Sequence, residues 1–501
     1  MSASGPDGRG VGRLVALPVD GRPVVRAQVV ELFAAAGWDL VVPPVAALGH
    51  FRTPADRDAL AAWLTEAAAD AEGLVLSLDM LVYGGLVPSR FIADSEYSLI
   101  ARLALLRDLK ARHPALPIHA FAATMRLSNN DVAEEEKPYW SDYGRLIWRW
   151  SYHTDRHAVL GDAADEREAT AARARIPDAI AEDYLATRAR NLAVTRAALD
   201  MVEAGLIDRL ILPQDDTAEF GWNIAERRLL AAEVTRRGLV DRVAIHPGAD
   251  EVLATLAAHL VGSLKPSTAR KVFLCFGEPD QVAALTARYE DRPFLDTVRG
   301  QLAACGLVEC ATPDAADVIV AVHTRGTAQG DWAMRAPLPQ PTPINPLWAR
   351  QLREWVAAAR PVALLDAAYA NGGDPALIDT LGDLPLARLA GYGAWNTAGN
   401  RAGMLFATLA LNPESDDARA RLLSRRLYED FLWQAVERQR VRDRIREDSL
   451  SPSALTDAVR AHMVPAADTW GRAHALPWRV ADISLPWGRT FEIDLALERA
   501  A

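Results

Sequence analysis

The chain has 501 residues, half of them hydrophobic and 24% charged, and its formal net charge is −11. A chain of this length predicts two or three domains rather than one. The acidic balance, without a basic patch, lacks the electrostatic footprint of a nucleic-acid-binding protein. No apolar stretch reaches the ~20 residues that cross a bilayer. We therefore expect neither a nucleic acid nor a membrane as partner.

The three cysteines, Cys275, Cys305 and Cys310, form no CxxC pair and no zinc-ligand spacing. Cys275 lies within an apolar run, which favours a buried thiol without a chemical role. The first residues are rich in Gly and Ser and lack the apolar core of a signal peptide. We therefore predict a flexible tail over residues 1–12 and a cytoplasmic protein.

From residue 13 onward, short apolar runs alternate with helical patterns, as in parallel α/β folds. The region 132–175 interrupts this alternation. It is rich in Trp, Tyr and acidic residues, and it predicts a helical insertion above the strand ends. We predict an N-terminal α/β domain over residues 13–262. Its expected strands are 14–19, 39–42, 74–78, 118–125, 209–212 and 242–245, and its expected helices are 25–36, 54–69, 96–112, 177–204, 224–237 and 251–261.

Residues 263–267 (SLKPS) resemble a linker, and the alternation then begins again. We predict a second α/β domain over residues 263–412, with a cleft between the two domains. Residues 413–501 are expected to be helical around 427–445, then irregular, and to form a C-terminal cap. The expected strands of the second domain are 271–276, 318–323, 362–365 and 387–390, and its expected helices are 294–305, 346–359, 375–381 and 397–411.

Polar side chains follow the apolar runs at the points where the strands should end. In parallel sheets, ligands bind beyond the carboxyl ends of the strands. The same arrangement after several strands predicts a carboxylate-rich active site, and therefore an enzyme. The residues expected to hold a substrate there are Asp20, Arg22, Asp79, Tyr83, Arg90, Arg126, Asn129, His246, Asp250, Asp366, Trp395 and Asn396.

The adjacent pair Asp215–Asp216 is the strongest catalytic candidate. Neighbouring carboxylates push their pKa values apart, which suits one acid and one orienting anion. The alternative is a helix N-cap, with Asp216 or Thr217 capping the next helix and Glu219 completing a capping box. Asp250 has the same two interpretations, as a ligand of the site or as a cap.

Simpler interpretations also exist for the other polar candidates. Arg22 and Arg90 could pair with Asp20 and Asp79, because charges at buried strand ends are usually paired. Trp395 and Asn396 could offer an apolar face and amide groups to a sugar ring. Asn396 could equally well form an ordinary turn before the helix that follows it.

Four blocks in order resemble the bacterial family named domain of unknown function 4127. They are residues 17–23 (LPVDGRP), 77–86 (SLDMLVYGGL), 212–216 (LPQDD) and 393–400 (GAWNTAGN). Residues 205–216 (GLIDRLILPQDD) are also similar to family 84 glycoside hydrolases. That second resemblance implies action on N-acetylglucosaminides, with Asp215 orienting the acetamido group as internal nucleophile and Asp216 as general acid.

Three functions are compatible with these residues. The first is a glycoside hydrolase for small N-acetylhexosamine glycosides that needs no cofactor and uses substrate-assisted chemistry. The second is a metal-dependent isomerase, lyase or amidohydrolase acting on a sugar or hydroxy acid. In it, Asp79, Asp215, His246 and Asp250 would bind Mn²⁺, Mg²⁺ or Zn²⁺. The third is a non-catalytic sugar-binding protein. A small carbohydrate is the expected partner in the first and third, and a homo-oligomer is possible.

Overall fold

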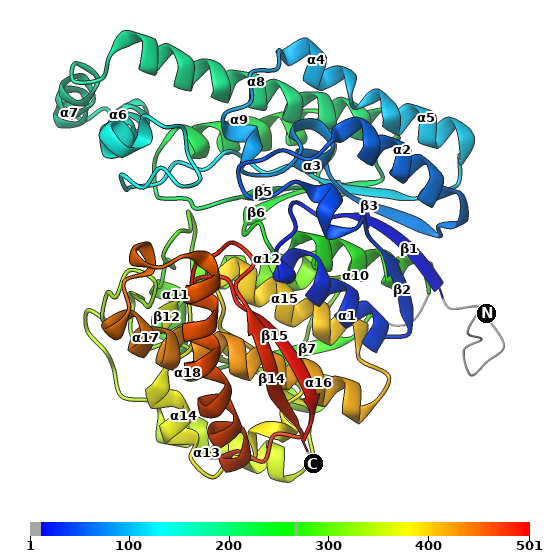
Figure 1. Ribbon diagram of the computed structural model, residues 1–501, viewed down its shortest axis with the longest axis vertical. Coiled ribbons are helices and arrows are strands. Elements are labelled where there is room, and N and C mark those ends of the chain that lie inside the picture. The colour runs from blue at the N-terminus through cyan, green and yellow to red at the C-terminus, as the bar shows by residue number, and fades with distance from the viewer. Residues whose placement is uncertain (1–11, 266–268, 501) are drawn as a thin grey trace.

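The computed structural model describes residues 12–265 and 269–500, and its frame is two parallel β-sheets with helices on both faces (Figure 1). The predicted α/β class is confirmed. The first sheet has the order β2-β1-β3-β4-β5-β6 and the second the order β13-β11-β9-β7-β8. The strands of the first sheet are β1 (Gly12–Leu17), β2 (Trp38–Val41), β3 (Gly73–Ser77), β4 (Ile118–Phe121), β5 (Arg209–Gln214) and β6 (Val243–Pro247). Those of the second are β7 (Lys271–Phe276), β8 (Val308–Glu309), β9 (Val318–His323), β11 (Val362–Asp366) and β13 (Gly391–Gly393).

The strands are apolar throughout because each is covered on both faces. In β1, Leu14 and Ala16 pack into one core cluster, whereas Val15 and Leu17 pack into another on the opposite face. Successive side chains of a strand point to opposite faces, so both sets must be apolar. This explains the continuous apolar runs of the sequence.

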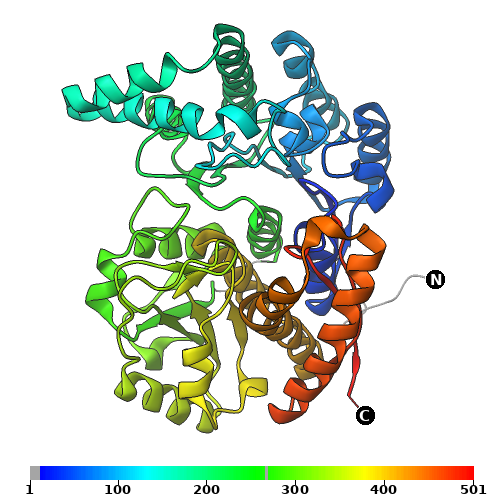
Figure 2. The same ribbon diagram turned by 60° about the vertical axis from the view of Figure 1, so that its left-hand side comes forward.

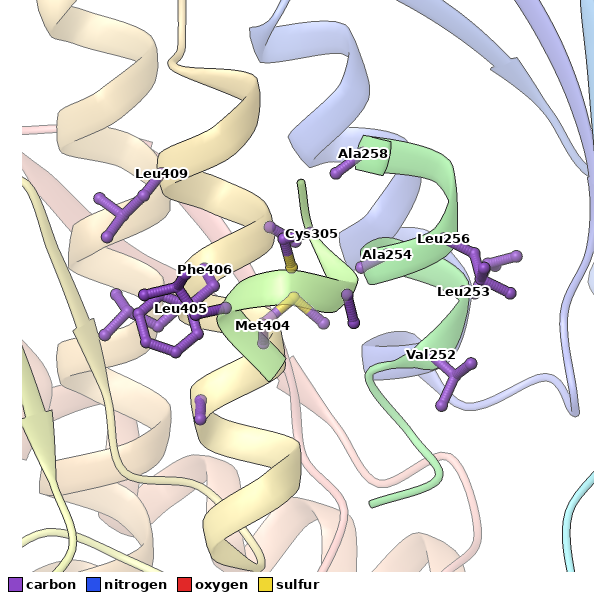
Figure 3. Close-up of a cluster of buried hydrophobic side chains, with 14 of the residues drawn as sticks. Val252, Leu253, Ala254, Leu256, Ala258, Cys305, Met404, Leu405, Phe406 and Leu409 are labelled. Atoms are coloured by element: carbon purple, nitrogen blue, oxygen red, sulfur yellow. The ribbon is translucent and has the colours of Figure 1, made fainter. Parts of the chain in front are cut away.

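Both sheets pack against one shared layer of helices. This layer contains α1 (Ala27–Ala35), α10 (Val252–Leu264), α12 (Phe294–Ala304) and α15 (Ala398–Leu411), and one core cluster unites them with strands of both sheets. Figure 3 shows part of it, with Ala254 of α10 facing Cys305 and Met404. We call the first sheet with its covering helices the first half, and the second sheet with its covering helices the second half. The shared core fixes the two halves relative to each other.

Other helices cover the outer faces of the two sheets. Over the first sheet lie α2 (Arg57–Ala67), α3 (Leu78–Tyr83), α4 (Glu96–Ala101), α5 (Ala104–Arg112), α8 (Asp178–Glu203) and α9 (Trp222–Arg236). Over the second lie α13 (Pro346–Ala357), α14 (Pro375–Leu381), α16 (Asp416–Arg426), a π-helical segment Leu427–Glu437, α17 (Arg438–Arg444) and α18 (Pro452–Ala473). The short helix α11 (Pro279–Ala284) follows β7. In the described part of the chain, no helix combines the length and apolar character needed to cross a membrane.

The predicted insertion is helical, with α6 (Trp140–Leu160) and α7 (Ala163–Arg173) projecting as a pair from the body (Figures 1 and 2). The predicted tail and linker lie largely outside the described residues, although Gly12 begins β1 and Leu264 ends α10.

Several predicted elements are wrong in detail. The helix expected at 96–112 is two helices, the loop expected after β3 contains α3, and the strand expected at 387–390 is displaced to β13. The irregular ending expected after 445 is instead α18 followed by an antiparallel hairpin of β14 (Trp478–Ser484) and β15 (Asp494–Arg499). In Figure 1 this hairpin (red) runs from the C-terminus toward the junction of the two sheets.

Candidate functional site

A cavity of about 180 Å³ lies where the carboxyl ends of the two sheets face each other, and we call it the site cavity. The loop between β14 and β15 borders it. In the first sheet, the strand order reverses between β1 and β3, the position at which doubly wound sheets bind ligands. The first half contributes Arg22, Leu86, Val87, Arg90, Arg126, Asn130, Glu135, Asp215, Asp216 and Asp250. The second half contributes Tyr289, Ala333, Asn371 and Asn396, and the C-terminal loop contributes Trp487, Arg489, Phe491 and Glu492.

Asp250 ties the two halves together, and Arg22 holds it from the first half. Arg22 Nη2 lies 2.8 Å from Asp20 Oδ2 and 2.5 Å from Asp250 Oδ1. Asn396, from the second half, donates from Nδ2 to Asp250 Oδ2 at 3.0 Å. Burial raises the pKa of Asp250 to about 6, against the opposing effect of Arg22. Four predicted residues thus meet in one network.

The two catalytic candidates have different arginine partners. Arg90 donates from Nη2 to Asp215 Oδ2 at 3.0 Å, and Arg126 donates from Nη1 to Asp216 Oδ2 at 3.3 Å. Glu135 Oε2 lies 3.1 Å from Arg126 Nη2 and accepts from Arg90 Nη1 at 3.3 Å. The predicted pairing of Arg22 with Asp20 is confirmed, whereas Arg90 pairs with Asp215 instead of the expected Asp79.

Among the carboxyl groups that line the site cavity and have a raised pKa, Asp216 has the higher value. Burial, and then the neighbouring charge of Asp215, raise the pKa of Asp216 to about 7, while Arg126 opposes the rise. Its side chain keeps 29% of its accessible surface and borders the site cavity. A proton held there can reach a bound substrate.

Asp79 is buried, close enough to Asp215 for their charges to interact. It is 2% exposed, and its Oδ2 accepts from the backbone N–H of Ala123 at 2.9 Å. Burial raises the pKa of Asp79 to about 7, with a smaller contribution from Asp215. Asp79 therefore contacts the backbone next to the site and does not line the cavity.

Strained backbone is concentrated around the cavity. Nine non-glycine residues of the described chain have positive φ, and Asp216, Tyr289, Asn371 and Asn396 are among them, at 35°, 66°, 60° and 61°. Such conformations persist where surrounding contacts enforce them, and they cluster at functional sites. All four residues line the cavity.

The helix-cap interpretation of the aspartates is wrong. α9 begins after Gly221 without a side-chain cap, and both the N–H and the Oγ1 of Thr217 donate to Tyr289 O. Asp250 binds Arg22 and Asn396 instead of capping α10, which has no side-chain cap. These carboxylates are therefore available to the site.

Several other predicted residues lie away from the cavity. Asn129 is exposed and its neighbour Asn130 lines the cavity instead. Tyr83 is buried, with the Arg190 guanidinium 5.9 Å from its ring. Trp395 is 4% exposed and packs in the shared core, where its ring centroid lies 6.3 Å from that of Phe491.

His246 and Asp366 are buried elsewhere. His246 contacts Gln301, whose Nε2 lies 3.2 Å from its Nδ1, and burial lowers the pKa of His246 to about 4. Asp366 accepts from Tyr392 Oη in the second half. The structure does not group the four residues that were expected to bind a metal, namely Asp79, Asp215, His246 and Asp250. Over residues 12–265 and 269–500, no three His, Cys, Asp or Glu side chains are grouped to hold a metal ion.

Except for Asn396, the residues of the second half and of the C-terminal loop were not predicted from the sequence. Trp487 places its ring 4.8 Å from the Arg22 guanidinium, and Arg489 donates to Glu135 Oε1 and Glu492 Oε1, both at 2.7 Å. The only local signal was the mixed aromatic and charged run at residues 487–492 (WGRTFE). For Tyr289 and Asn371 no local signal existed.

Comparison with curated proteins and comparison with solved structures both find no match. One family model matches, over residues 14–496, and its description is protein of unknown function (DUF4127). The match covers nearly the whole chain, including every residue that lines the site cavity. The chain therefore belongs to the DUF4127 family.

Proposed function

We propose that this protein is a glycoside hydrolase acting on small glycosides, with N-acetylhexosaminides as the first class to test. One observation carries the proposal. A carboxyl group whose pKa is raised to about 7, Asp216, borders a polar cavity beside a second carboxylate held by an arginine. Two carboxyl groups in different environments are the arrangement that acid-assisted glycoside cleavage needs.

In the proposed reaction, Asp216 donates its proton to the glycosidic oxygen as the bond from that oxygen to C1 breaks. The carbonyl oxygen of the substrate's acetamido group attacks C1, and Asp215 orients that group through its N–H. Water then opens the cyclic intermediate and Asp216 recovers a proton. Arg90 holds Asp215 in place, so the chain need supply no nucleophile of its own.

The charges of the cavity favour a neutral, hydroxyl-rich ligand. Each of the four arginines that line it already binds one or more carboxylates, so their donors are largely used. The volume of about 180 Å³ is below the range typical of drug-sized ligands, which favours a small ligand such as a single sugar ring. Asn130, Asn371 and Asn396 add amide groups for hydroxyls.

A screen of 4-nitrophenyl glycosides, N-acetylhexosaminides first, tests the proposal. We expect kcat/KM to fall as the pH rises past about 7, because Asp216 then loses the proton it must donate. Asp314→Asn is the matched control for the variant Asp216→Asn. Asp314 also pairs with an arginine, at 3.0 Å, but its side chain is 92% exposed. The absence of turnover for every hexoside and hexosaminide would refute the proposal.

A further inference from the structure

Asp331 anchors two of the side chains that line the second-half wall of the site cavity. It ends the short strand β10 (Gly330–Asp331) and is fully buried. Its Oδ2 accepts from Tyr289 Oη at 2.5 Å, and its Oδ1 accepts from Asn371 Nδ2 at 3.0 Å. The backbone N–H groups of Ala333 and Met334 also donate to Oδ1, at 2.8 and 3.1 Å. Asp331 itself does not line the cavity.

These bonds decide where the tyrosine proton lies. A carboxylate surrounded by four donors accepts hydrogen bonds and has none to give. Burial and the charge of Asp331 raise the pKa of Tyr289 far above its usual range, so the phenol keeps its proton and directs it at Asp331. The lone pairs of Tyr289 Oη therefore remain for a ligand.

The same carboxylate orients the amide of Asn371. Only the NH₂ end of an amide can donate, so Nδ2 faces Asp331 and Oδ1 points away from it. Asn371 N–H also donates to Asn396 O at 2.9 Å, which fixes its backbone. Tyr289 and Asn371 both have positive φ, a backbone conformation that persists only where the surrounding contacts enforce it.

The two walls of the cavity differ in charge. The first-half wall carries Asp215, Asp216 and Asp250 with the arginines that bind them, whereas Tyr289, Asn371 and Asn396 of the second-half wall are uncharged. Tyr289 and Asn371 are anchored on the two oxygens of one carboxylate, which leaves Tyr289 Oη and Asn371 Oδ1 as acceptors for a ligand in the cavity.

We propose that Tyr289 and Asn371 determine specificity by accepting hydrogen bonds from two neighbouring hydroxyl groups of the substrate, and that Asp331 is the positioning residue that aims them. This rests on the proposed glycosidase function, and it narrows the substrate class to sugars with a free vicinal diol. A sugar that lacks either hydroxyl leaves a buried acceptor without a donor and is discriminated against.

The test compares Tyr289→Phe with wild type on the active 4-nitrophenyl glycoside and on its monodeoxy analogues. We expect Tyr289→Phe to lower kcat/KM on the parent about tenfold, mainly through KM. One deoxy analogue lacks the hydroxyl group from which Tyr289 accepts its hydrogen bond. On that analogue, kcat/KM of the variant and of wild type should be equal. Tyr139→Phe is the matched control, because Tyr139 also donates to an aspartate, Asp183 at 2.7 Å, but lies outside the cavity. An equal loss on every analogue would overturn the proposal.

Binding separates this inference from the proposed function. If wild type hydrolyses no glycoside, calorimetric titration with the free monosaccharides and their deoxy forms still reports on the acceptor wall. Binding that is weakened about tenfold by Tyr289→Phe, and only for sugars with the diol, would support the inference while the hydrolase proposal fails. Turnover of a parent glycoside with no preference for the diol would leave the hydrolase proposal standing and overturn the inference. If wild type shows neither turnover nor binding, both proposals are overturned.

Discussion

Asp216 follows the buried parallel strand β5, and Asp366 is the last residue of the buried parallel strand β11, at the corresponding end of the other sheet. The Asp216 side chain keeps 29% of its surface, has positive φ and lines the site cavity. Asp366 has no exposed surface and accepts hydrogen bonds from Asp374 N at 2.7 Å and Tyr392 Oη at 3.2 Å. Access to a cavity, rather than place in the fold, distinguishes the two aspartates.

This difference shows what a strand-end carboxylate needs in order to act on a ligand. Burial raises the pKa of both groups. Only Asp216 combines the raised pKa with open space in front of it and with a paired neighbour, Asp215, that holds charge. Asp366 joins its own strand to the loop before α14 and is structural.

The largest expected effect is that of Asp216→Asn on catalysis. Turnover of an aryl glycoside should fall by roughly 10²–10⁴-fold, because the general acid is lost. The melting temperature should change little, because an uncharged amide replaces a carboxyl group that is half protonated near pH 7. Leaving groups that need little protonation should lose less. A loss of stability with activity kept would show that Asp216 is structural after all.

Asp366→Ala should have the opposite effect, a loss of stability without a change in substrate binding. It leaves the Tyr392 hydroxyl and the Asp374 N–H buried without an acceptor, so we expect unfolding in urea to be easier by about 3–5 kcal/mol. Asp366→Asn keeps one acceptor oxygen and should cost less. The folded fraction of either variant should retain the wild-type KM. A raised KM with unchanged stability would place Asp366 in the site.

Much of the first-half site could be predicted, because the ends of strands can be predicted from the sequence. Asp20, Arg22, Arg126, Asp216 and Asp250 follow apolar runs, and adjacent parallel strands bring whatever follows them to one edge. Their hydrogen-bond partners were not predictable, since the assignment of Arg90 to Asp215 depends on loop shape. Asp366 shows the same local pattern but is closed in by Asp374, at the start of α14, and by Tyr392.

The rest of the site depends on long-range folding. Trp395 and Trp487 both stand beside polar residues in the sequence, yet Trp395 packs in the core and Trp487 lines the cavity. Trp487 reaches it because it lies in the loop between β14 and β15, which borders the cavity. Tyr289 and Asn371 owe their importance to Asp331, which is not adjacent to either in sequence. Local patterns do not contain this information.

A third, smaller effect concerns pH. The pKa of Asp79 rises from 3.8 to about 7 on folding, so the folded state binds this proton more tightly than the unfolded chain. The stabilisation is complete below about pH 4 and is lost as the pH rises through 7. Between pH 5 and 8 this group alone should remove about 2–3 kcal/mol of stability.

Asp79→Asn should remove that contribution, because an amide does not titrate while its oxygen can still accept from Ala123 N–H. Urea unfolding at both pH values should therefore show wild type losing more stability than the variant. Asp58→Asn is a control, since the Asp58 side chain is 88% exposed. Identical pH dependence in wild type and Asp79→Asn would mean that Asp79 is ionised in the folded protein.

The smallest effect separates two neighbouring asparagines. Asn129 is exposed and, within the described residues, its side chain has no hydrogen-bond partner, so Asn129→Ala should leave stability and KM unchanged. Asn130 lines the cavity, and its Oδ1 accepts from Val132 N–H at 3.0 Å. Asn130→Ala should cost about 1 kcal/mol and raise KM a few-fold, whereas Asn130→Asp keeps the acceptor and should restore the stability. Equal effects of the two alanine variants would mean that the wall of the cavity ends before residue 130.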